Sequence, residues 1–170
     1  MRRPEATECD EYFHPYIEKF QGDDLLGEFE AQPQRLKELL GNLPEGEDGK
    51  LHAPFTWTLK QVMGHLVDTE RIFSTRLLRI AANDPTSNPG FDQDDFVANF
   101  DYQSVTMRNL LEEFAVLRKA TAMMVRRCSD EQLSRKGTCS GSELTARAAF
   151  FLMGGHVVYH EQIMRKRLAG

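Results

Sequence analysis

Hydrophobic residues recur with helical spacing in four segments of the chain. In residues 24–40, 58–82 and 104–128 the apolar side chains return every three or four positions, and a fourth segment continues to about residue 168. This spacing places them along one face of a helix, which becomes stable when that face packs against others. No strand-like alternation of useful length occurs in the sequence. We therefore predict an all-α chain whose four long helices form a four-helix bundle.

Turn-forming and capping residues indicate where these helices begin and end. Thr56 or Thr58 can cap the second helix, and Ser140 and Glu143 have the spacing of a capping box at the start of the fourth. Pro33 lies inside the first segment, where a proline removes a backbone hydrogen bond. We expect it to kink or shorten that helix.

The composition is that of an ordinary globular protein with a mild excess of acid. The 26 acidic and 21 basic residues give a net charge of -5, whereas binding to a nucleic-acid backbone needs a clustered positive face. We expect no nucleic-acid partner. The longest apolar stretch, residues 148–153, is too short to cross a membrane. We expect a single domain over residues 1–170, with the bundle at about 24–168 after an N-terminal extension at 1–23.

The cysteines and the first residues indicate a reducing compartment. Cys9, Cys128 and Cys139 are odd in number and form no C-x-x-C pair, so neither a disulfide framework nor a thiolate zinc site is indicated. No apolar segment follows the two arginines at the start, so a signal peptide is not indicated. We expect a cytoplasmic protein without a membrane partner.

Two of the five histidines repeat at helical spacing. His156 and His160, in the stretch GGHVVYHE, are four residues apart and so lie one turn apart on the same helix face. Their neighbours on that face are apolar, which turns the imidazoles into the bundle, where unsatisfied ring nitrogens are costly. A divalent metal ion would satisfy a nitrogen of each ring. The alternative is a pair of core histidines, and the spacing alone leaves both interpretations open.

His65 adds a third candidate ligand from the second helix, beside its apolar stripe. Metal sites in helix bundles are built from inward side chains on facing helices, and three neutral ligands with an open position are typical of a catalytic site. Imidazole suits zinc, nickel and copper. We predict that His65, His156 and His160 bind one divalent ion, zinc or nickel. His14 and His52 are expected to be surface or loop residues.

Two familiar metal motifs fail on residue identity. A zincin needs H-E-x-x-H, but Val157 follows the first histidine of the pair. A di-iron bundle needs two E-x-x-H motifs, and the chain offers one, Glu11 to His14, outside the predicted bundle.

The charged residues of the helices have different expected environments. Glu70 falls on an apolar stripe, about 140° around the helix from His65. We interpret it as a buried carboxylate paired with an arginine or tyrosine, with a role as a base left open. Asp68 is expected on the outer face, and Arg118 on a solvated face of the third helix together with Glu112, Glu113 and Lys119.

The sequence resembles the DinB-like superfamily of damage-inducible bacterial proteins from about Leu25 to the C-terminus. The resemblance depends on the combination of GHLVDTE, the acidic loop PGFDQDD and the H-x-x-x-H of the last helix. It implies a bundle of up-down-down-up order, usually a homodimer, with one metal ion held by three histidines that match His65, His156 and His160. The chain departs from the family at Pro33, and at Tyr159, where relatives often carry another histidine.

The resemblance also bears on activity. Some relatives are thiol S-transferases that use bacillithiol or mycothiol, one is a mycothiol-dependent maleylpyruvate isomerase, and many have no known activity. We therefore expect a metal-dependent enzyme that transfers a low-molecular-weight thiol to a small electrophilic substrate. The alternatives are a metal-dependent hydrolase and a non-enzymatic metal-binding stress-response protein.

The expected pocket lies between the second and fourth helices, partly covered by the loop at residues 91–95. Glu70 and Tyr159 are the only evident proton-transfer groups, so the general acid or base stays unassigned. A homodimer is expected because symmetric dimers are the commonest oligomers and the chain has 11 phenylalanines.

Overall fold

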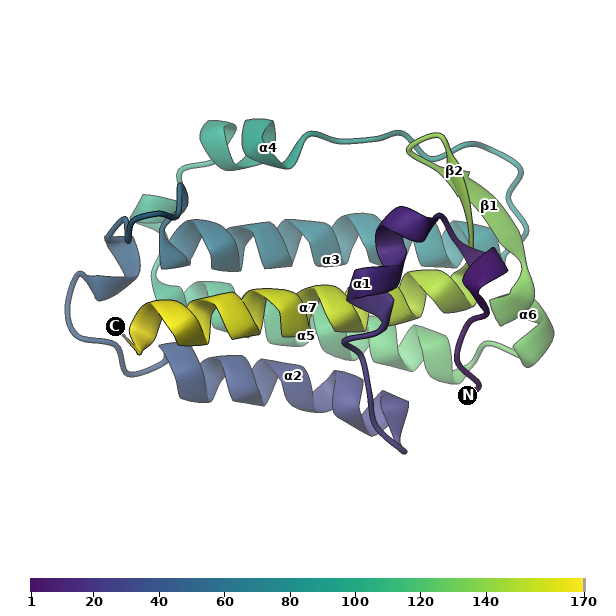
Figure 1. Cartoon of the computed structure of the whole chain (residues 1–170), viewed down its shortest axis with the longest axis horizontal. Coiled ribbons are helices and arrows are strands. Elements are labelled where there is room, and N and C mark those ends of the chain that lie inside the picture. Colours follow the sequence, from purple (N-terminus) through teal and green to yellow (C-terminus); the bar gives the residue numbers. More distant parts are fainter. Residues whose placement is uncertain (170) are drawn as a thin grey trace.

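The computed structural model describes residues 1–169 and contains a bundle of four long helices (Figure 1). These are α2 (Leu25–Leu40), α3 (Leu59–Ala81), α5 (Met107–Arg126) and α7 (Ala146–Leu168). Helices α2 and α7 run in one direction and α3 and α5 in the other, which gives the order up-down-down-up (Figure 1). Helix α3 packs against both α5 and α7, and so does α2. The predicted all-α four-helix bundle is confirmed.

Short elements connect the long helices. They are η1 (Ala6–Glu8), η2 (Glu11–Phe13), α1 (His14–Ile17), η3 (Glu47–Gly49), α4 (Gln93–Asn99), η4 (Tyr102–Ser104), α6 (Asp130–Ser134), β1 (Lys136–Cys139) and β2 (Ser142–Thr145). Because α3 and α5 are parallel, the chain between them must return along the bundle. It does so over α3, with α4 in its path (Figure 1).

Polar side chains cap each long helix at its N-terminus. Asp24, Thr58, Thr106 and Thr145 accept hydrogen bonds from backbone N–H groups of the first turns of α2, α3, α5 and α7. Thr58 forms the full capping box with Gln61. The threonine cap predicted for the second helix is therefore confirmed.

The predicted start of the fourth helix was wrong, because residues 136–145 form a β-hairpin. Strands β1 and β2 are antiparallel, with Cys139 opposite Ser142. Ser140 and Gly141 both have positive φ, 54° and 85°, as the tight turn of a two-residue hairpin requires. Ser140 consequently lies in the turn, and Thr145 caps the helix instead. The prediction of a chain without strands missed this hairpin.

Pro33 does not shorten the first helix. Helix α2 continues for 16 residues, with Pro33 inside it.

A layer of buried polar groups divides the core into two apolar clusters. The first cluster contains Phe20, Phe29, Phe73 and Phe150 among others. The second contains Leu36, Met63, Phe114 and Met164 among others. Along every long helix the change from one cluster to the other coincides with a buried polar side chain or a buried backbone carbonyl. We call these groups the polar layer: Gln32, Glu70, Arg118, Thr121 and the carbonyl of Gly154.

Hydrogen bonds connect the polar layer across all four helices. The Arg118 guanidinium donates to Glu70 Oε2 at 2.8 Å and to Gln32 Oε1 at 2.6 Å. Gln32 Nε2 donates to the carbonyl oxygen of Gly154 at 2.8 Å. The predicted pairing of Glu70 with an arginine is confirmed, whereas the prediction that Arg118 is solvated was wrong, because only 1% of it is exposed. Burial lowers the pKa of Arg118 to about 10 and raises that of Glu70.

The N-terminal extension packs on the bundle and crosses α7 through α1 (Figure 1). Glu8 accepts a hydrogen bond from Thr145 Oγ1 at 2.7 Å and pairs with buried Arg147 at 3.2 Å. The extension is therefore attached at the start of α7 as well as at its middle. None of the described helices is long and apolar enough to cross a membrane.

Candidate metal centre

Three histidines converge where α3 packs against α7. His65 comes from α3, and His156 and His160 come from successive turns of α7. The Nε2 atom of His156 lies 3.1 Å from the Nε2 atoms of both His65 and His160. All three residues offer ring nitrogens within 4.8 Å of one another. The structure thus brings together the three residues selected from the sequence; that they bind a metal stays a prediction.

Two of the three nitrogen separations fit one tetrahedral ion. Ligand nitrogens at 2.0–2.1 Å from zinc with tetrahedral angles lie about 3.3 Å apart, close to the 3.1 Å found here. Hydrogen bonding does not account for the cluster. An imidazole nitrogen carries either one proton or one lone pair, so His156 Nε2 can make only one of its two contacts a good hydrogen bond. An ion at the centre would use the lone pairs of all three nitrogens.

A neighbouring hydroxyl prepares His65 for this role. Thr69 Oγ1, one turn along α3, lies 3.4 Å from His65 Nδ1. A proton on Nδ1 that is donated to this hydroxyl leaves the lone pair on Nε2, the nitrogen that faces the other two rings.

The protein environment keeps the three imidazoles neutral. Burial lowers the pKa of His65 to about 4 and that of His160 to about 3. Burial, followed by the neighbouring imidazoles of His160 and His65, holds the pKa of His156 well below its usual value. The neutral form is the one that ligates metals, so the cluster is ready to bind at physiological pH.

Aromatic side chains surround the histidine rings. The ring centroids of Trp57 and His65 are 5.1 Å apart, those of Tyr16 and His156 are 5.9 Å apart, and Tyr159 meets His160 edge-on at 5.1 Å. These contacts restrict how far the three imidazole rings can turn.

Two cavities adjoin the histidines. The first, about 410 Å³, is lined by His65 and His156, and the second, about 360 Å³, by His156 and His160. Phe91 lines the first and Asp94 the second, while Gln93 lines both. The predicted pocket between the second and fourth helices, with residues 91–95 beside it, is therefore present. An ion at the cluster would be reachable by a small molecule.

The other polar residues considered in the sequence lie apart from the cluster. His14 Nε2 is 3.1 Å from the carbonyl oxygen of Ala6, and His52 Nε2 is 2.8 Å from Glu47 Oε1, both consistent with local structural roles. Asp68 was predicted to be solvated. It is instead half-buried and accepts a hydrogen bond from the Tyr102 hydroxyl, while burial raises the pKa of its carboxyl group.

Sequence reasoning missed three residues that line the cavities beside the cluster, Tyr16, Trp57 and Arg76. Tyr16 and Trp57 lie outside the four amphipathic segments, so no pattern pointed to them. Arg76 was detectable, because it follows His65 by 11 residues and so lies within about 20° of it around the helix.

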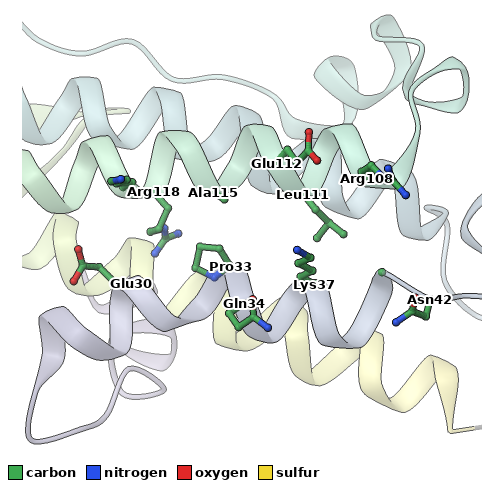
Figure 2. A pocket seen from close by; sticks show the side chains of 12 residues that line it. Glu30, Pro33, Gln34, Lys37, Asn42, Arg108, Leu111, Glu112, Ala115 and Arg118 are labelled. Carbon is green, nitrogen blue, oxygen red and sulfur yellow. The ribbon is translucent and has the colours of Figure 1, made fainter.

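A larger groove of about 710 Å³ lies elsewhere, between α2 and α5 (Figure 2). Its walls include Lys37 and Gln34 from α2 and Arg108 and Glu112 from α5. It shares no lining residue with the two cavities beside the histidines. We therefore place the candidate site at the histidines.

The family model of the DinB superfamily matches residues 28–164. The chain belongs to the DinB superfamily. The match covers all four long helices except the ends of α2 and α7, and it includes the three histidines. No curated protein matches this sequence.

Two solved structures have the same fold as this DinB protein. YfiT from Bacillus subtilis, described as a probable metal-dependent hydrolase with an unusual four-helix bundle topology, superposes with a TM-score of 0.77 at 17% identity, over 99% of this chain and 94% of YfiT. A mycothiol-dependent maleylpyruvate isomerase superposes with a TM-score of 0.66 at 14% identity, over 88% of this chain and 61% of the isomerase. At these identities the likeness concerns the fold.

Proposed function

We propose that this DinB protein is a metal-dependent enzyme that transfers a low-molecular-weight thiol to a small electrophile. The observation that carries the proposal is the set of three neutral imidazoles with two open cavities beside it. Three protein ligands with access from solvent are typical of catalytic sites, whereas structural sites are closed. Zinc and nickel are the proposed ions, since imidazole suits both.

A divalent ion bound there would lower the pKa of a thiol and so supply a nucleophile at neutral pH. With its Nδ1 proton donated to Thr69 Oγ1, His65 would present the lone pair of Nε2 to the ion. The Trp57 and Tyr16 rings pack beside the rings of His65 and His156. As the sulfur–carbon bond forms, the electrophile's leaving group departs with its bonding electrons and the thiol proton goes to solvent.

Glu70 is a poor candidate for a base in this site. Its carboxylate lies in the polar layer, with Oε2 2.8 Å from Arg118, and lines neither cavity. The thiol reaction does not require a side-chain base, which favours it here.

Hydrolysis is the second candidate, and Asp94 is the observation that favours it. This carboxylate lines the cavity beside His156 and His160. It could accept a proton from an attacking water at a carboxylate oxygen. The likeness to YfiT, which is described as a probable metal-dependent hydrolase, is consistent with this alternative.

The first test is the metal content of protein purified without a histidine tag. We expect one divalent ion per chain in the wild type and substantial loss in His156→Ala. His52→Ala is the matched control, because its ring pairs with Glu47 far from the cluster. Equal metal content in His156→Ala and wild type, or none in wild type, would overturn the assignment.

The second test separates the two reactions. Conjugation of a generic electrophile is assayed with bacillithiol, mycothiol, glutathione and coenzyme A, using metal-stripped protein and His65→Ala as controls. We expect activity with at least one thiol that both controls lose. Protein that holds its metal but reacts with no thiol is then assayed on ester and amide substrates, with Asp94→Asn as the variant that a hydrolase should not tolerate. Inactivity in both assays would support the non-enzymatic alternative.

A further inference from the structure

Arg76 lines the cavity beside His65 and His156 and carries a charge that no acidic side chain neutralises. Only 4% of the residue is exposed, and within residues 1–169 no carboxylate pairs with its guanidinium. Every other arginine that is similarly buried in the described structure, Arg118 and Arg147, pairs with an acid. A buried charge without a partner is costly, so its presence at a cavity wall requires an explanation.

The contacts of Arg76 use two of its five N–H donors. Nη2 donates to the carbonyl oxygen of Pro89 at 2.6 Å and to Ser140 Oγ at 3.0 Å. The guanidinium carbon lies 4.8 Å from the centroid of the Phe73 ring and 5.6 Å from that of Phe91. In the described chain Nε and Nη1 have no acceptor, and neither atom is enclosed by protein. The N–H groups of these two atoms are therefore available to donate to an oxyanion.

The position of Arg76 along α3 limits the length of a ligand that could reach it from the histidines. Arg76 and His65 lie on the same face of the helix, and 11 residues correspond to about 16 Å along its axis. Phe73 lies between them, and Leu152 and Met153 of α7 line the same cavity. The path from the histidines to the guanidinium is therefore elongated and largely apolar.

The charges around the cavity favour an anion. Asp10 is the only acid that lines it. Its carboxylate is exposed, and its oxygens already accept from the backbone N–H of Tyr12 and from Ser142 Oγ. Arg76 is thus the dominant charge within the cavity.

We propose that the substrate is an elongated small molecule with an apolar middle and an oxyanion, carboxylate or phosphate, at the end away from the histidines, where Arg76 binds it. The inference rests on the proposed function for one end of the molecule only. This is the reacting end, which would lie at His65 and His156. The anion-binding end depends only on the cavity and Arg76.

The test is calorimetric binding of straight-chain carboxylates from hexanoate to dodecanoate, the matching alkyl phosphates and the matching n-alcohols. Metal-loaded and metal-free wild type are compared with Arg76→Gln and with Arg76→Lys, which keeps the charge. We expect wild type to prefer one of the anionic series to the alcohol of equal length. Arg76→Gln should lose about ten- to a hundredfold of the anion affinity and bind the alcohols unchanged.

Two results would overturn the inference. One is equal affinity of wild type for anions and alcohols of the same length, which needs no variant. The other is a parallel loss of anion and alcohol binding in Arg76→Gln, since that is expected if Arg76 only holds Pro89 and Ser140 in place. Should Arg76→Gln not fold, Arg76→Lys decides: anion preference retained supports the inference, and its loss opposes it. If the protein binds no metal but still prefers anions, the proposed function is overturned and the anion-binding role of Arg76 is not.

Discussion

Replacing Arg118 with methionine removes the only cation of the polar layer. Glu70, 2% exposed, is left as a buried carboxylate without its partner at 2.8 Å. Its Oε1 atom already lacks a hydrogen bond in the described structure. Breaking a buried pair in this way costs about 3–5 kcal/mol. Gln32 also loses a donor at 2.6 Å, which adds about 1 kcal/mol.

The stability that Arg118→Met loses relative to wild type should increase as the pH rises. Burial already raises the pKa of Glu70, and without Arg118 that pKa rises further. A carboxyl group whose pKa is higher in the folded than in the unfolded state gives full stability below the unfolded value. That stability is lost as the pH rises toward the folded value, by about 1.4 kcal/mol per unit. We therefore expect Arg118→Met to be closest to wild type near pH 4.5 and to lose stability relative to it at higher pH.

Urea denaturation of metal-free protein at several pH values measures both effects. Arg126→Met is the matched control, since Arg126 also links α5 to α2 through Glu30 but is half exposed, and we expect it to cost less than about 1 kcal/mol. The double variant Glu70→Gln, Arg118→Met should recover at least about 2 kcal/mol relative to Arg118→Met alone. A cost of Arg118→Met equal to that of the control, or a double variant no more stable than the single one, would refute the reasoning.

Three further predictions follow from the site and its surroundings. Thr69→Val should weaken metal affinity about tenfold in a chelator competition without unfolding the protein, because His65 loses the partner of its Nδ1, whereas Thr75→Val on the same helix should not. Gly155→Ala should lower the melting temperature despite a gain of about 1 kcal/mol in helix propensity, because its Cβ would overlap the carbonyl oxygen of Tyr16; a melting temperature at or above that of wild type would contradict this. Light scattering at micromolar concentration should give the mass of a homodimer, and a monomer would refute it, although the phenylalanine content no longer supports a dimer because the core contains most of it.

The four helices and the three histidines were predictable because each rests on spacing. Apolar stripes identify the helices, and residues one turn apart must share a face, which is why His156 and His160 meet in the structure. The contribution of His65 required the further assumption that α3 and α7 are neighbours. Helix packing supplies that contact, and bundle geometry made it a reasonable expectation.

The burial of Arg118 was not predicted because its charge was given more weight than its position on the helix. Arg118 follows Leu111 by seven residues and Phe114 by four, so it lies on the buried face of α5. The signal was present in the spacing. A charged residue on such a face needs a buried partner, and Glu70 on the apolar stripe of α3 was the evident one.

The hairpin was not predicted because its strands are too short to show a pattern. Each has four residues, and the pairing depends on the turn at Ser140 and Gly141, where both residues adopt positive φ. Asn88 pairs with Cys139 and connects the hairpin to the chain that returns over α3. The pairing of Asn88 with Cys139 joins distant parts of the sequence, which local spacing does not encode.

The stretch from Gly154 to His160 explains why the N-terminal extension belongs to the site although its sequence lies outside the bundle. A Cβ at Gly154 would lie 2.6 Å from the ring of Phe20, and one at Gly155 would overlap the backbone of Tyr16. The two glycines therefore let the extension contact the backbone of α7 directly. That contact places the Tyr16 ring 5.9 Å from His156 and in the lining of both cavities. Without the glycines the extension would be displaced, and the histidine cluster would lose the Tyr16 side chain that lines both of its cavities.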